Sequence, residues 1–167
     1  MSEIEQLCPK CGMCCDSTLF ADVELRSGDA PERLAKLGLK IEQKTKTRLA
    51  FAQPCGCFTG KLCQIYPDRP KRCRLFECGV LKRVEKGEMT VSAALKKIHD
   101  AKRRAERVRE LLRAAGQRDE QIPLTHRYAE VMGAPVDLAE EDAAERRGEL
   151  IMAVSDLMQR LERDFLR

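Results

Sequence analysis

The sequence predicts an α+β protein: a small, loop-rich, cysteine-cluster domain with short strands, followed by a mostly α-helical region that forms a long helical hairpin. Three observations lead to this fold class. All nine cysteines lie within residues 8–78. Turn-forming Pro and Gly residues surround the later cysteines, and the second half shows helical periodicity. We expect two domains, a cysteine-cluster domain at 1–88 and a helical region at 89–167.

The first half alternates short strands, one short helix and loops. Alternating apolar residues over 19–25 predict a strand with one buried face. Asp29 as an N-cap, Pro31 in the first turn and Gly38 as a stop predict a short helix. A stretch rich in Thr and apolar residues, 41–52, predicts a second strand.

The second half predicts three helices. Thr90 is a favourable N-cap, and Gly116 a stop, for a long helix with a heptad-like seam. A shorter helix capped by Thr125 ends at Gly133, and the last helix starts near Asp137 and runs to the end. We expect the two long helices to pack against each other or against a partner. The expected apolar positions are Val91, Ala94, Ile98, Ala101, Ala105, Val108 and Leu112, then Tyr128, Val131 and Met132, then Leu150, Val154, Leu157, Leu161 and Phe165.

Charge and hydropathy exclude several classes of protein. The net charge of +4 is mild and its residues are intermixed, and the chain has no Trp and few other aromatic residues, so nucleic-acid binding is disfavoured. The alternative would use Arg103, Arg104, Arg107 and Arg113, which we interpret instead as a solvated, ion-paired helix face. The sequence has no apolar run long enough for a membrane helix, and its acidic start lacks a secretory signal. We therefore expect a cytoplasmic protein with no membrane contact.

The cysteine spacing predicts metal ligation. The cytosol keeps thiols reduced, and an odd number of cysteines cannot pair completely, so a disulfide scaffold is disfavoured. The alternative is thiol redox chemistry without a metal, at Cys14 and Cys15 or at Cys55 and Cys57. Clustered thiolates suit zinc or an iron–sulfur cluster, and neither His99 nor His126 stands at zinc-finger spacing. The predicted ligands are Cys8, Cys11, Cys14, Cys15, Cys55, Cys63, Cys73 and Cys78.

The division of these cysteines between centres stays open. Neighbouring side chains in an extended segment point in opposite directions, so Cys14 and Cys15 favour two different centres, or one centre with a free thiol beside it. Two four-sulfur sites and a single cluster with spare thiols both fit the count. Cys57 is left out of the ligand set, because Cys55 lies on the same side and one of the two is surplus.

Basic residues surround the later cysteines. Arg69 and Arg74 would offset the negative charge of a thiolate site from just outside it. A solvated basic loop is the alternative interpretation.

The motifs C-x2-C-G-x-C-C, P-C and C-x-I-Y-x-x-R-P-x-x-C-R-x-F resemble those of the bacterial YkgJ-type cysteine-cluster family, described as zinc- or iron-chelating proteins. The resemblance covers about residues 7–80, and nothing in 90–167 takes part. It carries over to the eight predicted ligands, with Arg69, Pro70 and Arg74 as further marks, whereas Cys57 falls where the family more often has an apolar residue. The resemblance implies metal binding. Some relatives are described as iron–sulfur proteins, and the flagellin lysine methylases look like distant members, so the resemblance is only a weak indication of enzymatic activity.

The expected function is that of a cytosolic metal-binding protein that holds zinc or an iron–sulfur cluster and acts as a binding or structural module. Its C-terminal helices would dock a protein partner. The alternative is an iron–sulfur enzyme, with electron transfer or protein-lysine methylase-like activity. No catalytic residue is assigned.

Overall fold

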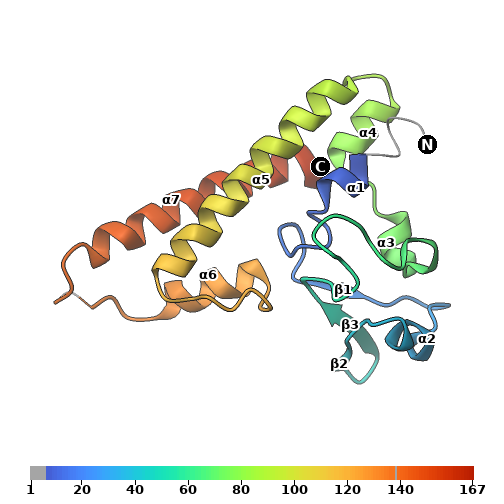
Figure 1. Cartoon of the computed structure of the whole chain (residues 1–167), viewed down its shortest axis with the longest axis horizontal. Helices are drawn as coiled ribbons and strands as arrows, with labels where there is room; N and C mark the ends of the chain where they lie inside the picture. The colour runs from blue at the N-terminus through green and yellow to red at the C-terminus, as the bar shows by residue number, and fades with distance from the viewer. Residues whose placement is uncertain (1–6, 138) are drawn as a thin grey trace. The chain divides into compact units, whose positions relative to one another are not determined.

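The computed structural model describes residues 7–137 and 139–167, and the chain divides into two compact units (Figure 1). The cysteine unit runs to Glu77 and includes Gln121–Pro123, and the helical unit comprises Cys78–Glu120 and Leu124–Arg167. The predicted α+β class is confirmed, since a small antiparallel sheet occurs together with several helices. The predicted domain boundary after residue 88 stays a prediction, because contacts within one chain do not show which part folds alone.

A three-stranded antiparallel sheet organises the cysteine unit. Its strands are β1 (Asp22–Glu24), β2 (Ile41–Thr45) and β3 (Arg48–Ala52), in the order β1-β3-β2. Val23 of β1 lies opposite Phe51 of β3, and both side chains are buried. The predicted single strand over 41–52 is therefore wrong: the chain reverses between Thr45 and Arg48.

The helices of the cysteine unit are short, and one loop carboxylate connects two of them. Pro31 begins its helix as predicted, but Ala30 is the N-cap residue and has no side-chain cap. Asp29, the predicted cap, instead accepts hydrogen bonds from the backbone N–H groups of Arg26 and Lys71, both at 2.8 Å. The helical elements are α1 (Leu7–Cys11), α2 (Pro31–Lys36), the 3-10 turn η1 (Tyr66–Asp68) and α3 (Lys71–Leu75).

The helical unit is built around two long helices that lie alongside each other, α5 and α7 (Figure 1). Thr90 caps α5 as predicted, since its Oγ1 accepts a hydrogen bond from Ala93 N at 3.2 Å. Gly116, with φ of +89°, follows the end of this helix. The elements are α4 (Gly79–Glu85), α5 (Val91–Ala114), α6 (Leu124–Gly133), α7 (Ala143–Leu161) and the π-helical turn η2 (Glu162–Leu166).

The predicted seams are largely confirmed. The buried residues are Ala94, Ile98, Ala101, Ala105, Val108 and Leu112 on α5, with Leu150, Leu157, Leu161 and Phe165 on α7 and η2.

Two helix starts differ from the predictions. The α6 helix begins at Leu124, so Thr125 lies inside it, and its buried residues are Leu124 and Arg127. The Arg127 guanidinium donates to the backbone oxygen of Gln117 at 3.0 Å, which makes its burial tolerable. The α7 helix begins at Ala143 rather than near Asp137.

Carboxylates pair with each of the four arginines that the nucleic-acid alternative would use. Arg103 and Arg104 bind Asp100, Arg107 binds Glu149, and Arg113 binds Glu106 and Glu120. These contacts are those of an ion-paired helix face. Among residues 7–137 and 139–167, no helix combines the length and apolar character needed to cross a membrane.

Candidate metal centre

A tight turn and a hairpin carry three of the later cysteines, Cys55, Cys57 and Cys63. Phe58 N donates to Cys55 O at 3.0 Å, which closes a β-turn over Cys55-Gly56-Cys57-Phe58. Phe58 then pairs with Cys63 across a short hairpin. The turn thus places Cys55 near Cys57, and the hairpin returns Cys63 to the same place.

Cys15, the last of the four cysteines near the start of the chain, lies beside this turn. Cys55 N donates to Cys15 O at 2.8 Å, so a hydrogen bond holds the two backbone segments next to each other. Gly12, with φ of +70°, follows α1 and lets the chain bend toward this contact. A Cβ at Gly12 would lie 2.5 Å from the ring of Phe58, so the packing also requires glycine.

Cys73 reaches the same region from α3. Asp29 accepts from the Lys71 backbone, and the Lys71 ammonium donates to Ser27 O at 2.6 Å. These two bonds fix the start of the helix to the loop after β1. Cys73 is half-buried and packs against the hydrophobic core of the unit.

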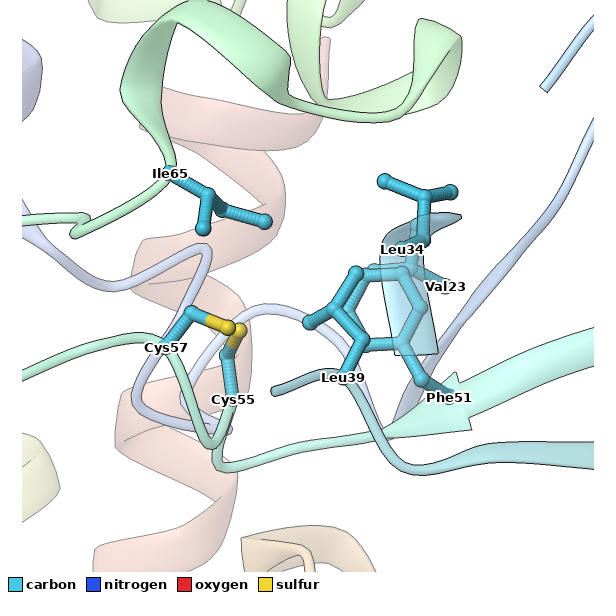
Figure 2. Close-up of a cluster of buried hydrophobic side chains, with 7 residues drawn as sticks. All are labelled: Val23, Leu34, Leu39, Phe51, Cys55, Cys57 and Ile65. Carbon is cyan, nitrogen blue, oxygen red and sulfur yellow. The ribbon is translucent and has the colours of Figure 1, made fainter. Parts of the chain in front are cut away.

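That core contains sulfur as well as carbon (Figure 2). Cys55 and Cys57 are 9% and 4% exposed, and Figure 2 shows their sulfur atoms pointing toward each other. The Cys57 thiol donates to Leu37 O at 3.3 Å. The core is made of Val23, Leu34, Leu39, Phe51, Cys55, Cys57 and Ile65, with Cys15, Cys63 and Cys73 packed against it.

Burial makes ionisation of these thiols costly. It raises the pKa of Cys15 and of Cys55 to about 12, and nearby sulfurs, Cys63 and Cys73 among them, add to both shifts. Burial likewise raises the pKa of Cys73 to about 11, with Cys63 contributing. Without a cation the thiols therefore stay protonated near neutral pH.

One arginine partly opposes this effect. The Arg69 guanidinium lies 3.5 Å from the centre of the Tyr66 ring, and its Nε donates to Tyr66 O at 2.9 Å. From this position its charge lowers the pKa of Cys73, although burial outweighs it. Arg74, the other predicted charge-compensating residue, is exposed.

The structure thus brings together four of the eight predicted ligands, which are Cys15, Cys55, Cys63 and Cys73. Cys57, which is not a predicted ligand, lies in the same core. Three others lie on α1 and the turn after it, with Cys8 exposed and Cys11 and Cys14 half-buried. Cys78 belongs to the helical unit, where it caps α4 and its Sγ accepts from Leu81 N at 3.5 Å.

The chemistry of this donor set fits a thiophilic metal. Several sulfurs converge in one water-poor place, where only a cation could offset their ionised forms. Within the described part of the chain, no three Cys, His, Asp or Glu side chains already surround a common ion position. Binding an ion therefore requires the thiols to turn toward it.

Two residues of this region were missed by the sequence analysis. Asp29 lies close enough to Cys73 to raise its pKa. Gln53 is 1% exposed, and its Oε1 has no hydrogen-bond partner among residues 7–137 and 139–167. No local pattern of residues indicates either role, because both depend on contacts formed only in the folded chain.

Residues 7–107 match the model of the CxxCxxCC family, described as "Putative zinc- or iron-chelating domain". The match reaches into α5, so the expectation that it would stop near residue 80 is corrected. No curated protein and no solved structure matches this chain significantly.

Proposed function

Because the chain belongs to the CxxCxxCC family of zinc- or iron-chelating domains, we propose that its cysteine unit binds zinc or iron through Cys15, Cys55, Cys63 and Cys73. The observation that carries this proposal is the position of Cys15. It belongs to the group of cysteines at residues 8–15, yet its backbone carbonyl accepts a hydrogen bond from Cys55 N. Its side chain packs against the core that contains the later cysteines. A packing role alone gives no reason for sulfur at all these positions.

Four thiolates supply the complete ligand set that zinc or one iron–sulfur cluster requires. A bound cation would remove the electrostatic cost of ionising buried thiols, so that each ligating sulfur releases its proton on binding. Arg69 would offset part of the remaining negative charge beside Cys73.

The other family cysteines extend the proposal. Cys14 and Cys15 are adjacent, but it is Cys15 that packs against the core. Cys8, Cys11 and Cys14 are thus left as ligands for a further ion, in keeping with the divergent directions of neighbouring side chains. Cys78 stays a predicted ligand.

We propose a binding or structural role rather than a catalytic one. Four protein sulfurs leave no open position on a tetrahedral ion, which is typical of structural sites. A reducing compartment such as the cytosol would keep these cysteines as thiols that can bind a metal. The exposed Ile151, Met152 and Met158 on α7 are where a protein partner would bind.

Metal analysis of cysteine variants tests the proposal. Protein purified without oxygen is expected to contain zinc or iron, and its absorption spectrum separates colourless zinc from a coloured iron–sulfur cluster. Cys15→Ser and Cys63→Ser should each lose the ion of this centre. Cys14→Ser should retain that ion, and it is the matched control because it changes the neighbouring thiol.

Two results would contradict the proposal. One is a folded wild-type protein that contains neither zinc nor iron and takes up neither on addition. The other is equal metal loss in Cys14→Ser and Cys15→Ser, since the two residues would then serve the same ion.

A further inference from the structure

The core of the cysteine unit holds one sulfur more than a four-ligand centre requires. Cys15, Cys55, Cys63 and Cys73 complete such a centre. Cys57 lies in the same core and its thiol already has a partner, the carbonyl oxygen of Leu37. Cys57 is thus a surplus thiol held beside a ligand.

The local backbone pairs this surplus thiol with Cys55. The two residues occupy the first and third positions of the β-turn closed by Phe58, a spacing that suits the distance a disulfide spans. Gly56 lies between them, and a Cβ there would come within 3.1 Å of Gly38 O, so this turn packs closely against the chain near Leu37. Figure 2 shows the two sulfur atoms facing each other across the turn.

We propose that Cys55 and Cys57 form an oxidisable dithiol that a peroxide converts to a disulfide, with release of the ion held by Cys55. The dithiol is an inference from the geometry of the turn, whereas the release of metal rests on the proposed function.

Burial selects the oxidant. With Cys55 and Cys57 only 9% and 4% exposed, a small peroxide can reach the sulfurs, whereas glutathione disulfide or a protein disulfide is too large to approach them. Cys55, as the ligating residue, is the thiolate and is therefore the sulfur that attacks the peroxide. Cys57, bonded to Leu37 O, is the resolving thiol.

The chemistry balances with hydrogen peroxide as the oxidant and one proton from solvent. Cys55, as a ligand, is a thiolate: its sulfur attacks one peroxide oxygen, the O–O bond breaks, and a sulfenic acid and a hydroxide form. The hydroxide takes a proton from solvent and becomes one water. The Cys57 sulfur then attacks the sulfenic sulfur, the S–O bond breaks, and the Cys57 proton leaves with the hydroxyl as a second water. The thiolate and the thiol thus give two electrons to the peroxide and become one disulfide. The disulfide removes Cys55 from the ligand set.

Peptide mass spectrometry reads this site directly. Trypsin releases residues 49–61 as one peptide, which contains Cys55 and Cys57 and no other cysteine. Oxygen-protected full-length protein is treated with hydrogen peroxide, alkylated and digested. We expect this peptide to lose the mass of two hydrogen atoms and to resist alkylation, while metal appears in solution in parallel. Glutathione disulfide at the same concentration should leave the peptide doubly alkylated.

Cys57→Ser is the matched variant, with Cys57→Ala as a second form in case the serine hydroxyl destabilises this buried position. Either variant should hold as much metal as the wild type, and Cys55 should then be captured as a sulfenic acid by dimedone. Cys14→Ser, which changes a thiol outside the turn, should form the disulfide normally.

Several outcomes would overturn the dithiol. They are full alkylation of peptide 49–61 after peroxide, a disulfide that joins this peptide to another, or loss of metal in both Cys57 variants. If the wild type binds no metal, the proposed function fails, and the same peptide measured on the reduced protein still decides the dithiol.

Discussion

At the scale of single residues, burial decides the chemistry of the sulfur atoms. It raises the pKa of Cys15 and Cys55 to about 12, so the metal-free core behaves as an apolar cluster that contains sulfur. A cation reverses this preference because it stabilises thiolate over thiol. The same side chains can therefore serve as packing in one state and as ligands in the other.

Gln53 is another buried polar residue of this unit, and it gives the first prediction. It directly follows β3, and its backbone N–H donates to Ala21 O at 2.9 Å. Its Oε1 accepts no hydrogen bond from the described part of the chain, so Gln53→Leu should leave the free energy of unfolding unchanged or raise it by up to about 2 kcal/mol. Urea unfolding of the metal-free protein measures this.

The matched control is Gln43→Leu, which changes an exposed glutamine of the same sheet. It should alter the free energy of unfolding by no more than about 0.5 kcal/mol. A loss of more than about 1 kcal/mol in Gln53→Leu would show that the amide is satisfied in solution.

Asp164 provides a pH-dependent prediction in the helical unit. Its side chain is 2% exposed and accepts from Lys97 Nζ at 2.9 Å. Burial alone would raise the pKa of Asp164, but hydrogen bonds from Lys97 and Arg163 outweigh it and hold this pKa below its usual value. Asp164→Asn should therefore lower the free energy of unfolding at pH 7, by about 1–3 kcal/mol.

The sign of the pH dependence follows from the lowered pKa. The stabilisation is complete above the unfolded pKa of about 3.9 and is lost as pH falls through the lower folded value. The free energies of unfolding of metal-free wild type and variant, measured in urea, should thus begin to converge as pH falls below about 4 and become similar only below the folded pKa of Asp164. Asp156→Asn, which changes an exposed carboxylate paired with Arg104, should have little effect at either pH. A constant difference between wild type and Asp164→Asn at all pH values would contradict the assignment.

At the scale of elements, two glycines in the helical unit have opposite roles. Gly79 begins α4, and a Cβ there would lie 2.5 Å from Arg167 O and 2.9 Å from Asp164 O. Gly148 lies inside α7 with open space around it. We expect Gly79→Ala to lower the free energy of unfolding by about 1–3 kcal/mol, and Gly148→Ala to raise it by about 0.5–1 kcal/mol.

Thermal unfolding of the two variants measures both effects, and each serves as the control for the other. A similar gain in stability for both would show that α4 does not approach the C-terminal turn closely in solution.

The elements differ in how far the sequence determines them. The α5 helix was predictable because Thr90, Gly116 and the seam between them are local signals. The reversal between β2 and β3 was not, since Lys46 and Thr47 carry no Gly, Pro or Asn turn signal. Asp29 was assigned to the wrong helix because its partner Lys71 lies 42 residues away.

The candidate site shows the same limit. The spacing of the cysteines predicts metal ligation, and adjacency predicts that Cys14 and Cys15 diverge. The choice of Cys15 as the one that joins Cys55, however, depends on a backbone hydrogen bond between distant segments. The burial of Cys57 likewise depends on the approach of Leu37, which no local pattern reveals.

At the scale of the whole molecule, the two units differ in what can stabilise them. The strands and helices of the cysteine unit are only three to six residues long, and its core is small. In the helical unit, α5 and α7 comprise 24 and 19 residues and share a continuous buried seam. A small loop-rich unit requires an additional cross-link, which the proposed metal ion would supply.

Metal removal should therefore affect the two units unequally. With a chelator and a thiol reductant, hydrogen exchange is expected to rise in β1, β3 and α3, because their cross-link is lost. Exchange in α5 and α7 should stay slow, since their seam does not involve the ion. Hydrogen-exchange mass spectrometry resolves these segments on the full chain, and adding back zinc or iron should restore protection to the cysteine unit alone. Equal loss of protection in both units would mean that they unfold as one cooperative structure. Unchanged exchange in the cysteine unit would mean that its apolar core alone suffices to hold the sheet.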